Sequence, residues 1–353
     1  MAEIVLFGAT GFTGTIVAEQ MHERGLPFAV AGRNQSKLEQ LSARLGNVPI
    51  CLADVERPYT LNTLTQDTQV LVNCVGPFLH YGEPVVNAAV EHGVHYLDIT
   101  GEQTWMKRIV NRYDGFALRN DTTVINAMAF DYAVGDWLAA LAARKVDGVR
   151  AIDSISVGYA VSRGGISQGT ALSALEMLGE RGWSYEGSHW QRRPLGWTHR
   201  RLPFPFGERE VTWLPFGETI MVPRHKTVRT VLTYGRLPSI LAHLLPLANY
   251  AGSAVRFLLR SIAKRYVARQ FTGPSLEQRR HTCFALTAEA RRAGRVEHAM
   301  ATGIDPYGLT ARIAALGAEL LLTESVPRGV RTPAHLPITP YEALKRVGVR
   351  LHE

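Results

Sequence analysis

The chain has 353 residues, which exceeds the size of one typical domain and predicts two domains. Hydrophobic residues make up 46% of it, enough to bury large cores, and its net charge of +8 suits anionic ligands or anionic membrane surfaces without requiring either. The arginines are scattered apart from two adjacent pairs, Arg192-Arg193 and Arg200-Arg201, so the sequence lacks a concentrated basic stripe and we expect no nucleic-acid partner.

Residues 3–14 combine a short apolar run with three glycines at every third position. The run predicts a strand, and the apolar spacing after the glycines predicts a helix, as in a dinucleotide-binding βαβ unit. Gly8 permits a sharp turn, Gly11 lets a pyrophosphate approach the backbone, and Gly14 lets the helix pack closely. The alternative is a tight turn that binds nothing. The residues expected to hold the cofactor here are Gly8, Ala9, Thr10, Gly11, Phe12, Thr13 and Gly14.

A second apolar run, Phe28–Ala31, ends in a polar segment that bears on the choice of nucleotide. An NAD site usually carries an acidic residue near this strand end, where it holds the ribose 2′-hydroxyl. This chain carries Arg33 instead, followed by Ser36 and Lys37. A guanidinium can pair with the 2′-phosphate that a carboxylate would repel, so we expect NADP(H). The alternative is that Arg33 and Lys37 are ordinary solvated charges at the start of a helix.

Apolar strands and helices continue to alternate along the first third of the chain. This pattern is typical of a parallel sheet covered on both faces, which predicts a doubly wound Rossmann domain. Asp54, at the end of the third strand, joins the expected cofactor-binding set. The predicted helices are 38–45 and 85–91, and the predicted strands are 48–54, 70–75, 94–98 and 122–126.

After residue 129 the pattern changes to longer strands with alternating polarity. Such strands predict an α+β domain with a mostly antiparallel sheet, half covered by helices. The elements expected here are a helix at 135–145 and strands at 151–161, 211–214, 227–234, 281–289 and 295–302.

Several motifs together resemble the saccharopine dehydrogenase-like oxidoreductases, and most of all their bacterial trans-acting enoyl reductase-like branch. The motifs are Gly8–Gly14, Ala31–Arg33, Val72–Phe78 with Gly82, Tyr96–Glu102, Asp305–Ala311 and Arg331–Ala334. The resemblance implies a Rossmann domain at 1–128, an inserted substrate and dimerisation domain at 129–325, and a C-terminal segment at 326–353 that returns to the Rossmann domain. The run Ala129–Asp136 departs from the Gly-Phe-Asp-Ser-x-Pro type of the family, so no role is transferred to Asp131.

A loop is expected at Val75–Gly82, beyond the carboxyl end of the fourth strand. Ligands of such sheets bind beyond the strand ends, so Gly76 and Pro77 would form a wall beside the nicotinamide, with Val75 and Phe78 close by. The alternative is a buried loop that Pro77 and Phe78 anchor.

The catalytic candidates lie at the end of the fifth strand and just after it: Tyr96, Asp98 and Glu102. A tyrosine and two carboxylates at this edge can orient a substrate or deliver a proton. The structural alternative is that Thr100 caps the following helix and Glu102 lies in its first turn. His80, His92 and His95 fall on different predicted elements, so we expect no metal site.

The substrate is indicated least clearly. Four arginines offer a carboxylate-binding set, Arg163, Arg200, Arg224 and Arg229, but no pattern brings them together. Residues 237–269 are strongly apolar and then basic, which predicts either a lipid-facing interfacial segment or a core or dimer-interface helix.

The family resemblance implies an NADP(H)-dependent oxidoreductase that acts on a carbonyl or a conjugated C=C of an apolar small molecule, such as a lipid or a polyketide. Two alternatives stay open: a non-catalytic NADP-binding sensor or scaffold, and a saccharopine-like amino-acid dehydrogenase. We expect a homodimer, and for 237–269 both peripheral membrane or lipid contact and a core or dimer-interface helix stay open. The first strand begins at residue 3 and the three cysteines are far apart, which predicts a cytoplasmic protein without a signal peptide; membrane association through 237–269 is the alternative.

Overall fold

The computed structural model describes residues 2–146, 148–162, 180–238, 242 and 273–352. The chain divides into two compact units: the first is Met1–Ala133 with Tyr307–Thr339, and the second is Val134–Pro306 with Pro340–Glu353. Compared with the predicted domain ranges, residues 129–133 and 307–325 fall in the first unit and residues 340–353 in the second.

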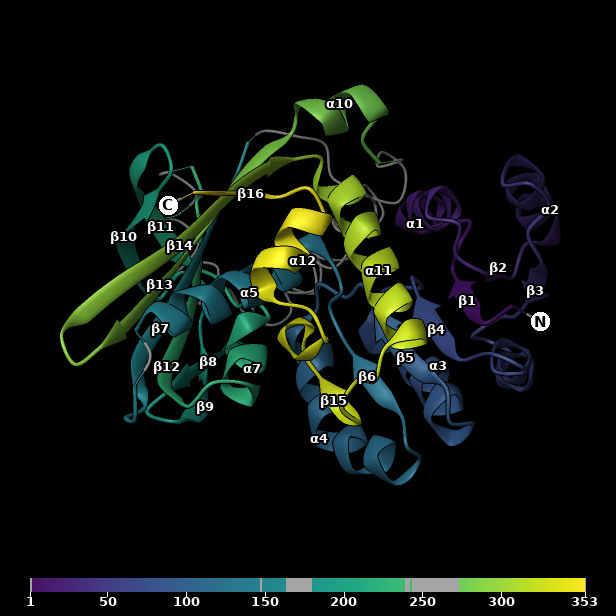
Figure 1. Ribbon diagram of the computed structural model, residues 1–353, viewed down its shortest axis with the longest axis horizontal. Helices are drawn as coiled ribbons and strands as arrows, with labels where there is room; N and C mark the ends of the chain where they lie inside the picture. Colours follow the sequence, from purple (N-terminus) through teal and green to yellow (C-terminus); the bar gives the residue numbers. More distant parts are fainter. Residues whose placement is uncertain (1, 147, 163–179, 239–241, 243–272, 353) are drawn as a thin grey trace, which may run out of the picture. The chain divides into compact units, whose positions relative to one another are not determined.

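The first unit is built on a sheet of seven parallel strands among the described residues, in the order β15-β6-β5-β4-β1-β2-β3 (Figure 1). The strands are β1 (Ile4–Phe7), β2 (Phe28–Gly32), β3 (Ile50–Leu52), β4 (Val70–Asn73), β5 (His95–Asp98), β6 (Thr123–Ile125) and β15 (Gly329–Arg331). The order changes direction between β1 and β4, which is the position where doubly wound sheets bind their ligands. The predicted Rossmann-type sheet is confirmed.

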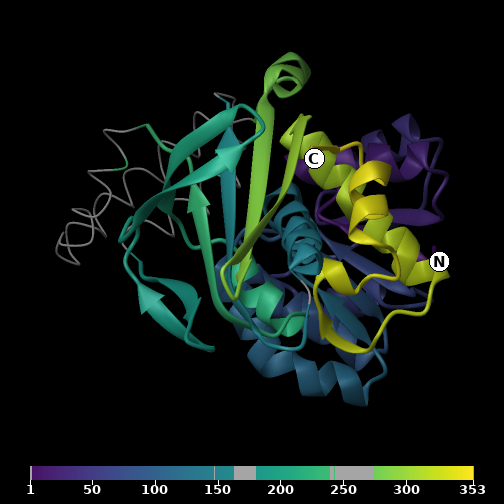
Figure 2. The same ribbon diagram turned by 60° about the vertical axis from the view of Figure 1, so that its left-hand side comes forward.

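Helices cover both faces of this sheet, as its continuously apolar strands require (Figures 1 and 2). On one face α3 and α4 pack against a core that includes Val5, Leu71 and Tyr96. On the other face α11 approaches closely, because a Cβ at Gly317 would lie 3.4 Å from Leu97. The helices of this unit are α1 (Phe12–Glu23), α2 (Gln35–Arg44), η1 (Pro58–Leu64), α3 (Phe78–Glu91), α4 (Gln103–Arg119), α11 (Pro306–Thr323) and η4 (Pro333–His335).

The predicted loop at 75–82 is shorter than expected, because α3 already begins at Phe78. Gly82 and Pro84 suggested a loop, but both lie inside the helix. Gly82 is required for packing, since a Cβ there would lie 2.6 Å from Cζ2 of Trp105 on α4. The loop between β4 and α3 is therefore limited to residues 74–77.

The second unit contains a nine-stranded sheet in its described part, with the main order β10-β11-β12-β7-β13-β14-β16 and β8 and β9 branching from β12. The strands are β7 (Ile152–Val161), β8 (Gly182–Glu186), β9 (His189–Arg193), β10 (His199–Phe204), β11 (Gly207–Trp213), β12 (Val228–Gly235), β13 (Cys283–Arg292), β14 (Arg295–Ile304) and β16 (Arg350–His352). The predicted antiparallel character is confirmed, with one exception: β12 and β7 run parallel.

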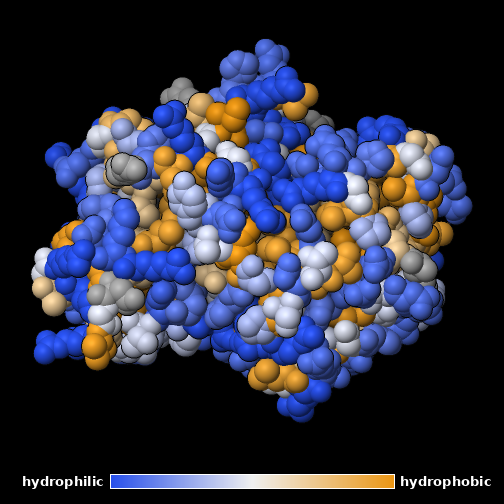
Figure 3. Space-filling view, viewed as in Figure 1, coloured by the Kyte–Doolittle hydropathy of each residue, from blue (hydrophilic) through white to orange (hydrophobic). Residues whose placement is uncertain are grey.

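The helices belonging mainly to this unit are α5 (Phe130–Lys145), α7 (Glu218–Met221), η2 (Val222–Arg224), α10 (Leu276–His281) and α12 (Pro340–Arg346). Helix α10 has no buried residue, and hydrophilic side chains cover most of it at the top of Figure 3. Most of the apolar and basic segment 237–269 lies outside the described residues. None of the described helices combines the length and apolar character needed to cross a membrane.

Candidate nucleotide-binding and catalytic site

The glycine turn between β1 and α1 is tightly packed on one side. Gly8 has a φ of +82°, in the left-handed region that favours glycine, and a Cβ there would lie 2.8 Å from Cγ2 of Val75. A Cβ at Gly14 would lie 2.1 Å from the Gly8 carbonyl oxygen, so α1 can begin this close to the turn only with glycine at that position. At Gly11 the nearest atom to such a Cβ, also Gly8 O, lies 3.2 Å away.

The N-terminus of α1 is suited to an anion. Gly11 is its N-cap residue, no side chain caps the helix, and its first turn contains no acidic residue. The first N–H groups of a helix have no acceptor within the helix, and the helix dipole adds positive potential there. Thr15 Oγ1 fixes the turn by donating to the Ala9 carbonyl oxygen at 3.1 Å. A diphosphate would satisfy the N–H groups at residues 12–14.

Arg33, Ser36 and Lys37 lie together, exposed, at the carboxyl end of β2 and the start of α2. Asn34 caps α2 by accepting the Lys37 N–H at 3.0 Å, which leaves the Lys37 side chain out of the cap. Within the described part of the chain, neither Arg33 nor Lys37 forms an ion pair with a carboxylate. Asp54 follows β3 on the neighbouring strand and is half-buried, and its carboxylate accepts the Glu56 N–H at 3.1 Å.

The predicted wall of the nicotinamide site divides into exposed and buried parts. Gly76 is exposed, and Val75 and Pro77 are half-buried, in the turn that follows β4. Phe78 is buried in the core and starts α3. Phe78 therefore supports the turn from within, as the alternative interpretation of this loop expected, whereas Val75, Gly76 and Pro77 are accessible at its surface.

The carboxylate of Glu102 caps helix α3. Its two oxygens accept the N–H groups of Phe78 and Leu79 at 2.8 and 2.9 Å. The side chain is buried, and Glu102 is itself the N-cap residue of α4, where its N–H donates to Thr100 Oγ1 at 3.0 Å. A carboxylate at a helix N-terminus is stabilised by the N–H groups and by the dipole. The arrangement ties the turn after β4 to the loop after β5.

Asp98 organises a buried hydrogen-bond network at the carboxyl ends of β5 and β6. Its side chain is fully buried and accepts bonds from Trp105 Nε1 at 2.8 Å and from Asn126 Nδ2 at 2.7 Å. It also accepts the backbone N–H groups of Thr100 at 3.2 Å and Ala127 at 3.0 Å. Burial raises the pKa of the Asp98 carboxyl, and these donors act in the opposite direction.

Tyr96 belongs to the same network and is also fully buried. Its hydroxyl donates to Asp98 Oδ2 at 3.1 Å and accepts from Asn73 Nδ2 at 3.1 Å. Burial, together with the Asp98 charge, holds the pKa of Tyr96 well above its usual range, so the phenol stays protonated. The structure thus brings Tyr96, Asp98 and Glu102 into one buried region, where they hold loops. Their direct contact with a substrate stays a prediction.

Asp131 is the carboxyl group that the sequence reasoning left without a role. It lies in the first turn of α5, six residues after β6; the residue as a whole is exposed, but the protein closely surrounds its carboxyl group. The Tyr132 hydroxyl donates to the Gly101 carbonyl oxygen at 2.6 Å, which holds this turn beside the loop after β5. The surrounding protein still desolvates the Asp131 carboxyl enough to raise its pKa to about 6. A pKa in this range suits proton transfer near neutral pH.

The remaining candidates are dispersed. Arg200 pairs with Glu289 at 2.7 Å, and Arg163 lies outside the described residues. His95 Nδ1 accepts the Thr123 N–H at 3.0 Å, and so holds the backbone at the start of β6. Among the described residues, no group of three or more His, Cys, Asp and Glu side chains is arranged to hold a metal ion.

Comparison with protein families identifies the part of the chain that carries this site. Residues 4–152 match the model of the saccharopine dehydrogenase NADP binding domain. The glycine turn, the Arg33 cluster and the Asp98 network lie within the residues that match this NADP binding domain, in line with the cofactor that the sequence predicted.

Three curated relatives align with the N-terminal part of the chain. A lipid droplet localized protein of Caenorhabditis elegans is 36% identical over 38% of this chain and 34% of its own length. A provisionally named trans-acting enoyl reductase of Mycobacterium tuberculosis is 34% identical, covering 50% of this chain and 44% of its own length. The human saccharopine dehydrogenase-like oxidoreductase is 32% identical, with coverages of 50% and 46%. The alignments thus span less than half of these relatives.

A likeness in fold extends over the whole chain. The apo form of saccharopine dehydrogenase (L-Glu forming) from Saccharomyces cerevisiae superimposes with a TM-score of 0.62 at 13% identity. The superposition covers 100% of this chain and 99% of that one. At this identity the likeness concerns the fold: a parallel Rossmann-type sheet combined with a second, mostly antiparallel sheet.

Proposed function

We propose that the protein is an NADP(H)-dependent oxidoreductase that reduces a carbonyl or a conjugated C=C of an apolar substrate, such as a lipid or polyketide chain. The observation that carries this proposal is the uncapped N-terminus of α1 together with Arg33 and Lys37, which form no ion pair among the described residues. The names of the M. tuberculosis and C. elegans relatives support an enoyl group and a lipid.

In this proposal the chain positions the reacting groups and supplies a proton. Bound NADPH provides the hydride. The N–H groups of α1 bind the diphosphate, and Arg33 binds the 2′-phosphate. Asp98 and Glu102 act as positioning residues, because their bonds hold the loops after β4, β5 and β6.

We assign the proton donor to Asp131 in preference to Tyr96. Tyr96 is fully buried with its hydroxyl engaged, whereas Asp131 is exposed at the same edge of the sheet. With a pKa of about 6, the Asp131 carboxyl is partly protonated near neutral pH. It can donate a proton to the reduced product and regain one from solvent.

The test follows the loss of reduced nicotinamide absorbance after mixing with acyl-chain enones and aldehydes. Because the protonated carboxyl is the active form, the rate should fall as the pH rises above about 6. Asp131→Asn should reduce the rate at least about tenfold and remove this pH dependence. Glu324→Gln, which changes an exposed carboxylate just after the end of α11, serves as the matched control.

Two results would contradict the proposal at different points. An unchanged pH profile in Asp131→Asn would remove Asp131 from the mechanism and leave the oxidoreductase assignment standing. Tight NADPH binding without consumption by any acceptor would favour the sensor or scaffold, an alternative that the full burial of Tyr96 supports. Turnover limited to saccharopine-like amino acids would favour the amino-acid dehydrogenase.

A further inference from the structure

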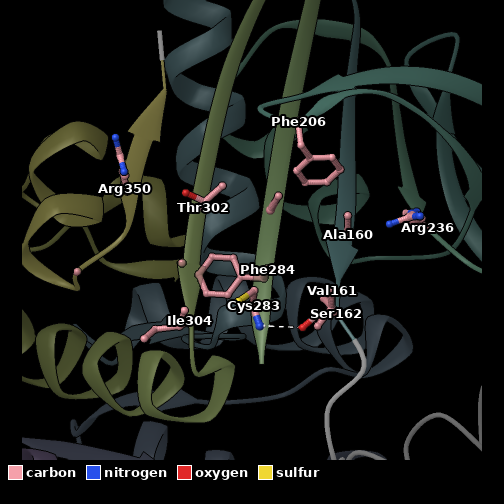
Figure 4. A pocket seen from close by; sticks show the side chains of 13 residues that line it. Ala160, Val161, Ser162, Phe206, Arg236, Cys283, Phe284, Thr302, Ile304 and Arg350 are labelled. Atoms are coloured by element: carbon pink, nitrogen blue, oxygen red, sulfur yellow. Dashed lines mark hydrogen bonds between the residues drawn. The ribbon is translucent and has the colours of Figure 1, made fainter. Parts of the chain in front are cut away.

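A shallow cavity of about 600 Å³ lies at one end of the sheet of the second unit (Figure 4). Its floor includes a cross-strand row of small side chains, because Ala160 pairs with Ala285 and Ala285 pairs with Thr302. Residues paired across strands project to the same face of a sheet, and on this face Ala160 and Ala285 are largely buried, 6% and 3% exposed, in a core cluster that also contains Leu202 and Phe204. The volume falls in the range of roughly 300–1,000 Å³ typical of small-molecule sites.

Large apolar side chains that remain exposed surround this row. Phe206, Val161 and Ile304 expose 45%, 48% and 54% of their surface. Phe206 stacks on the buried Phe204 with their ring centroids 5.6 Å apart, so its position is fixed despite its exposure. Exposed apolar side chains gathered around one cavity indicate an apolar ligand rather than a sugar or a free nucleotide.

A cation lies on each side of the apolar side chains. Arg350 and Arg236 appear on opposite sides of the cavity in Figure 4, and both are exposed. Arg350 pairs with Thr302 and therefore continues the row on the same face of the sheet, whereas Arg236 follows the end of β12. The Cα atoms of Ala160 and Arg350 are separated by three strand intervals, roughly 14 Å. The described residues offer no carboxylate partner to either guanidinium.

We propose that this cavity binds a fatty-acyl carboxylate, with the acid group on the Arg350 guanidinium and the chain lying along the Ala285 and Ala160 row beside Phe206. A guanidinium binds a carboxylate by two parallel hydrogen bonds, which gives the ligand a fixed end. Burial of each methylene along this row adds affinity. The residues that line the cavity all belong to the second unit, and the proposal does not depend on the proposed oxidoreductase activity.

The test is titration calorimetry of the full chain with dodecanoate, dodecanol and acetate below the micellar range. Dodecanoate should bind saturably and more tightly than either of the others, since they lack the acid group or the chain. Across octanoate, decanoate and dodecanoate the affinity should rise about two- to fourfold per methylene. Equal affinity for dodecanol and dodecanoate would overturn the proposal, as would the absence of saturable binding.

Two variants separate the contributions of charge and chain. Arg350→Gln should weaken dodecanoate at least about tenfold and leave dodecanol unchanged, because it removes only the ionic contact. Phe206→Ala should weaken both ligands. Arg346→Gln on α12 removes a nearby exposed charge outside the lining and should have no effect. If Arg346→Gln weakened dodecanoate binding as much as Arg350→Gln does, the effect of Arg350 would come from general surface charge and not from a direct contact. That result would overturn the assignment.

Cys283 provides a readout of position, because its exposed thiol lines the same cavity. Bound dodecanoate should slow alkylation of Cys283, measured by peptide mapping, while the buried Cys51 serves as internal reference. Protection should disappear in Arg350→Gln at the same ligand concentration. Dodecanoate binding without protection of Cys283 would place the ligand elsewhere and contradict the proposal.

Discussion

In the proposed binding mode Arg33 contacts the phosphate on the adenosine ribose, the group by which the two nicotinamide cofactors differ. We predict that Arg33→Gln lowers NADP+ affinity about 10- to 100-fold, the range that corresponds to a lost hydrogen bond to a charged group. NAD+ affinity should change less than about twofold, since NAD+ lacks that phosphate. Calorimetric titration measures both constants, and Arg346→Gln controls for net charge. A parallel loss for both cofactors would show that Arg33 does not contact the 2′-phosphate.

At the residue scale, the sequence predicted those features of the site that are formed by residues adjacent in the chain. The glycine spacing and the cation after β2 are local patterns, and Gly8 and Gly14 each occupy a position that a Cβ would disrupt. The partners of Asp98 were not predictable, because Trp105, Asn126 and Ala127 lie 7, 28 and 29 residues further along the chain. Their meeting depends on the pairing of β5 with β6.

At the scale of elements, His95 connects three segments of the first unit. Its Nδ1 accepts the Thr123 N–H, and Arg328 Nη1 lies 3.2 Å from its Nε2, just before β15. Burial, and secondly the Arg328 charge, lowers the pKa of His95. The neutral ring has one acceptor nitrogen, Nδ1, and through it joins the start of β5 to the start of β6, while the Arg328 guanidinium lies beside Nε2.

This pKa shift predicts a pH dependence of stability. Below the unfolded-state pKa of about 6.5 the unfolded chain binds a proton that the folded chain excludes. The free energy of unfolding should therefore fall as the pH drops through about 6.5, until the folded-state pKa is reached. Urea unfolding between pH 8 and 5, roughly, followed by circular dichroism, should show this slope in the parent and a smaller one in His95→Gln. His22→Gln, on the exposed end of α1, should keep the parent slope.

The accuracy of the element predictions followed the strength of the local pattern. The apolar runs at β1, β2 and β4 were recognised, whereas the three-residue β15 was too short to stand out. Helix α3 was predicted only from residue 85, because Gly82 and Pro84 interrupt a helical pattern. A side chain at position 82 would clash with the Trp105 ring on helix α4. The residues next to Gly82 in the sequence do not reveal this contact.

At the scale of the whole molecule, NADP+ binding should leave a distinct pattern of amide hydrogen exchange. We predict slower exchange at residues 9–15, 33–37 and 75–79, where the cofactor contacts the first unit, and no change in β13 and β14 of the second. Ligand binding suppresses local opening where contacts form. Dodecanoate should give the opposite pattern, with slower exchange at the starts of β13 and β16. Uniform protection of both units by NADP+ would contradict this separation of sites.

The division into two sheets was predicted, but the interleaving of the chain was only partly predicted. Residues 340–353 were expected with the first unit, whereas β16 pairs with β14 in the second. Which strand β16 pairs with depends on which edge strand of the two sheets has no neighbour on one side, and this is decided by residues far away in the sequence. Three-residue strands carry too little pattern to specify it.

The position of β15 has a consequence for biosynthesis. β6 gains this neighbour only when Gly329–Arg331 has been made, about 200 residues after β6 itself. At roughly 5–20 residues per second, the ribosome needs about 10 to 40 s for that interval. The backbone groups of one β6 edge stay unpaired in the nascent chain while all of residues 134–306 emerge. Unpaired edges invite association with other chains, so this interval is where a cellular chaperone has the most to protect.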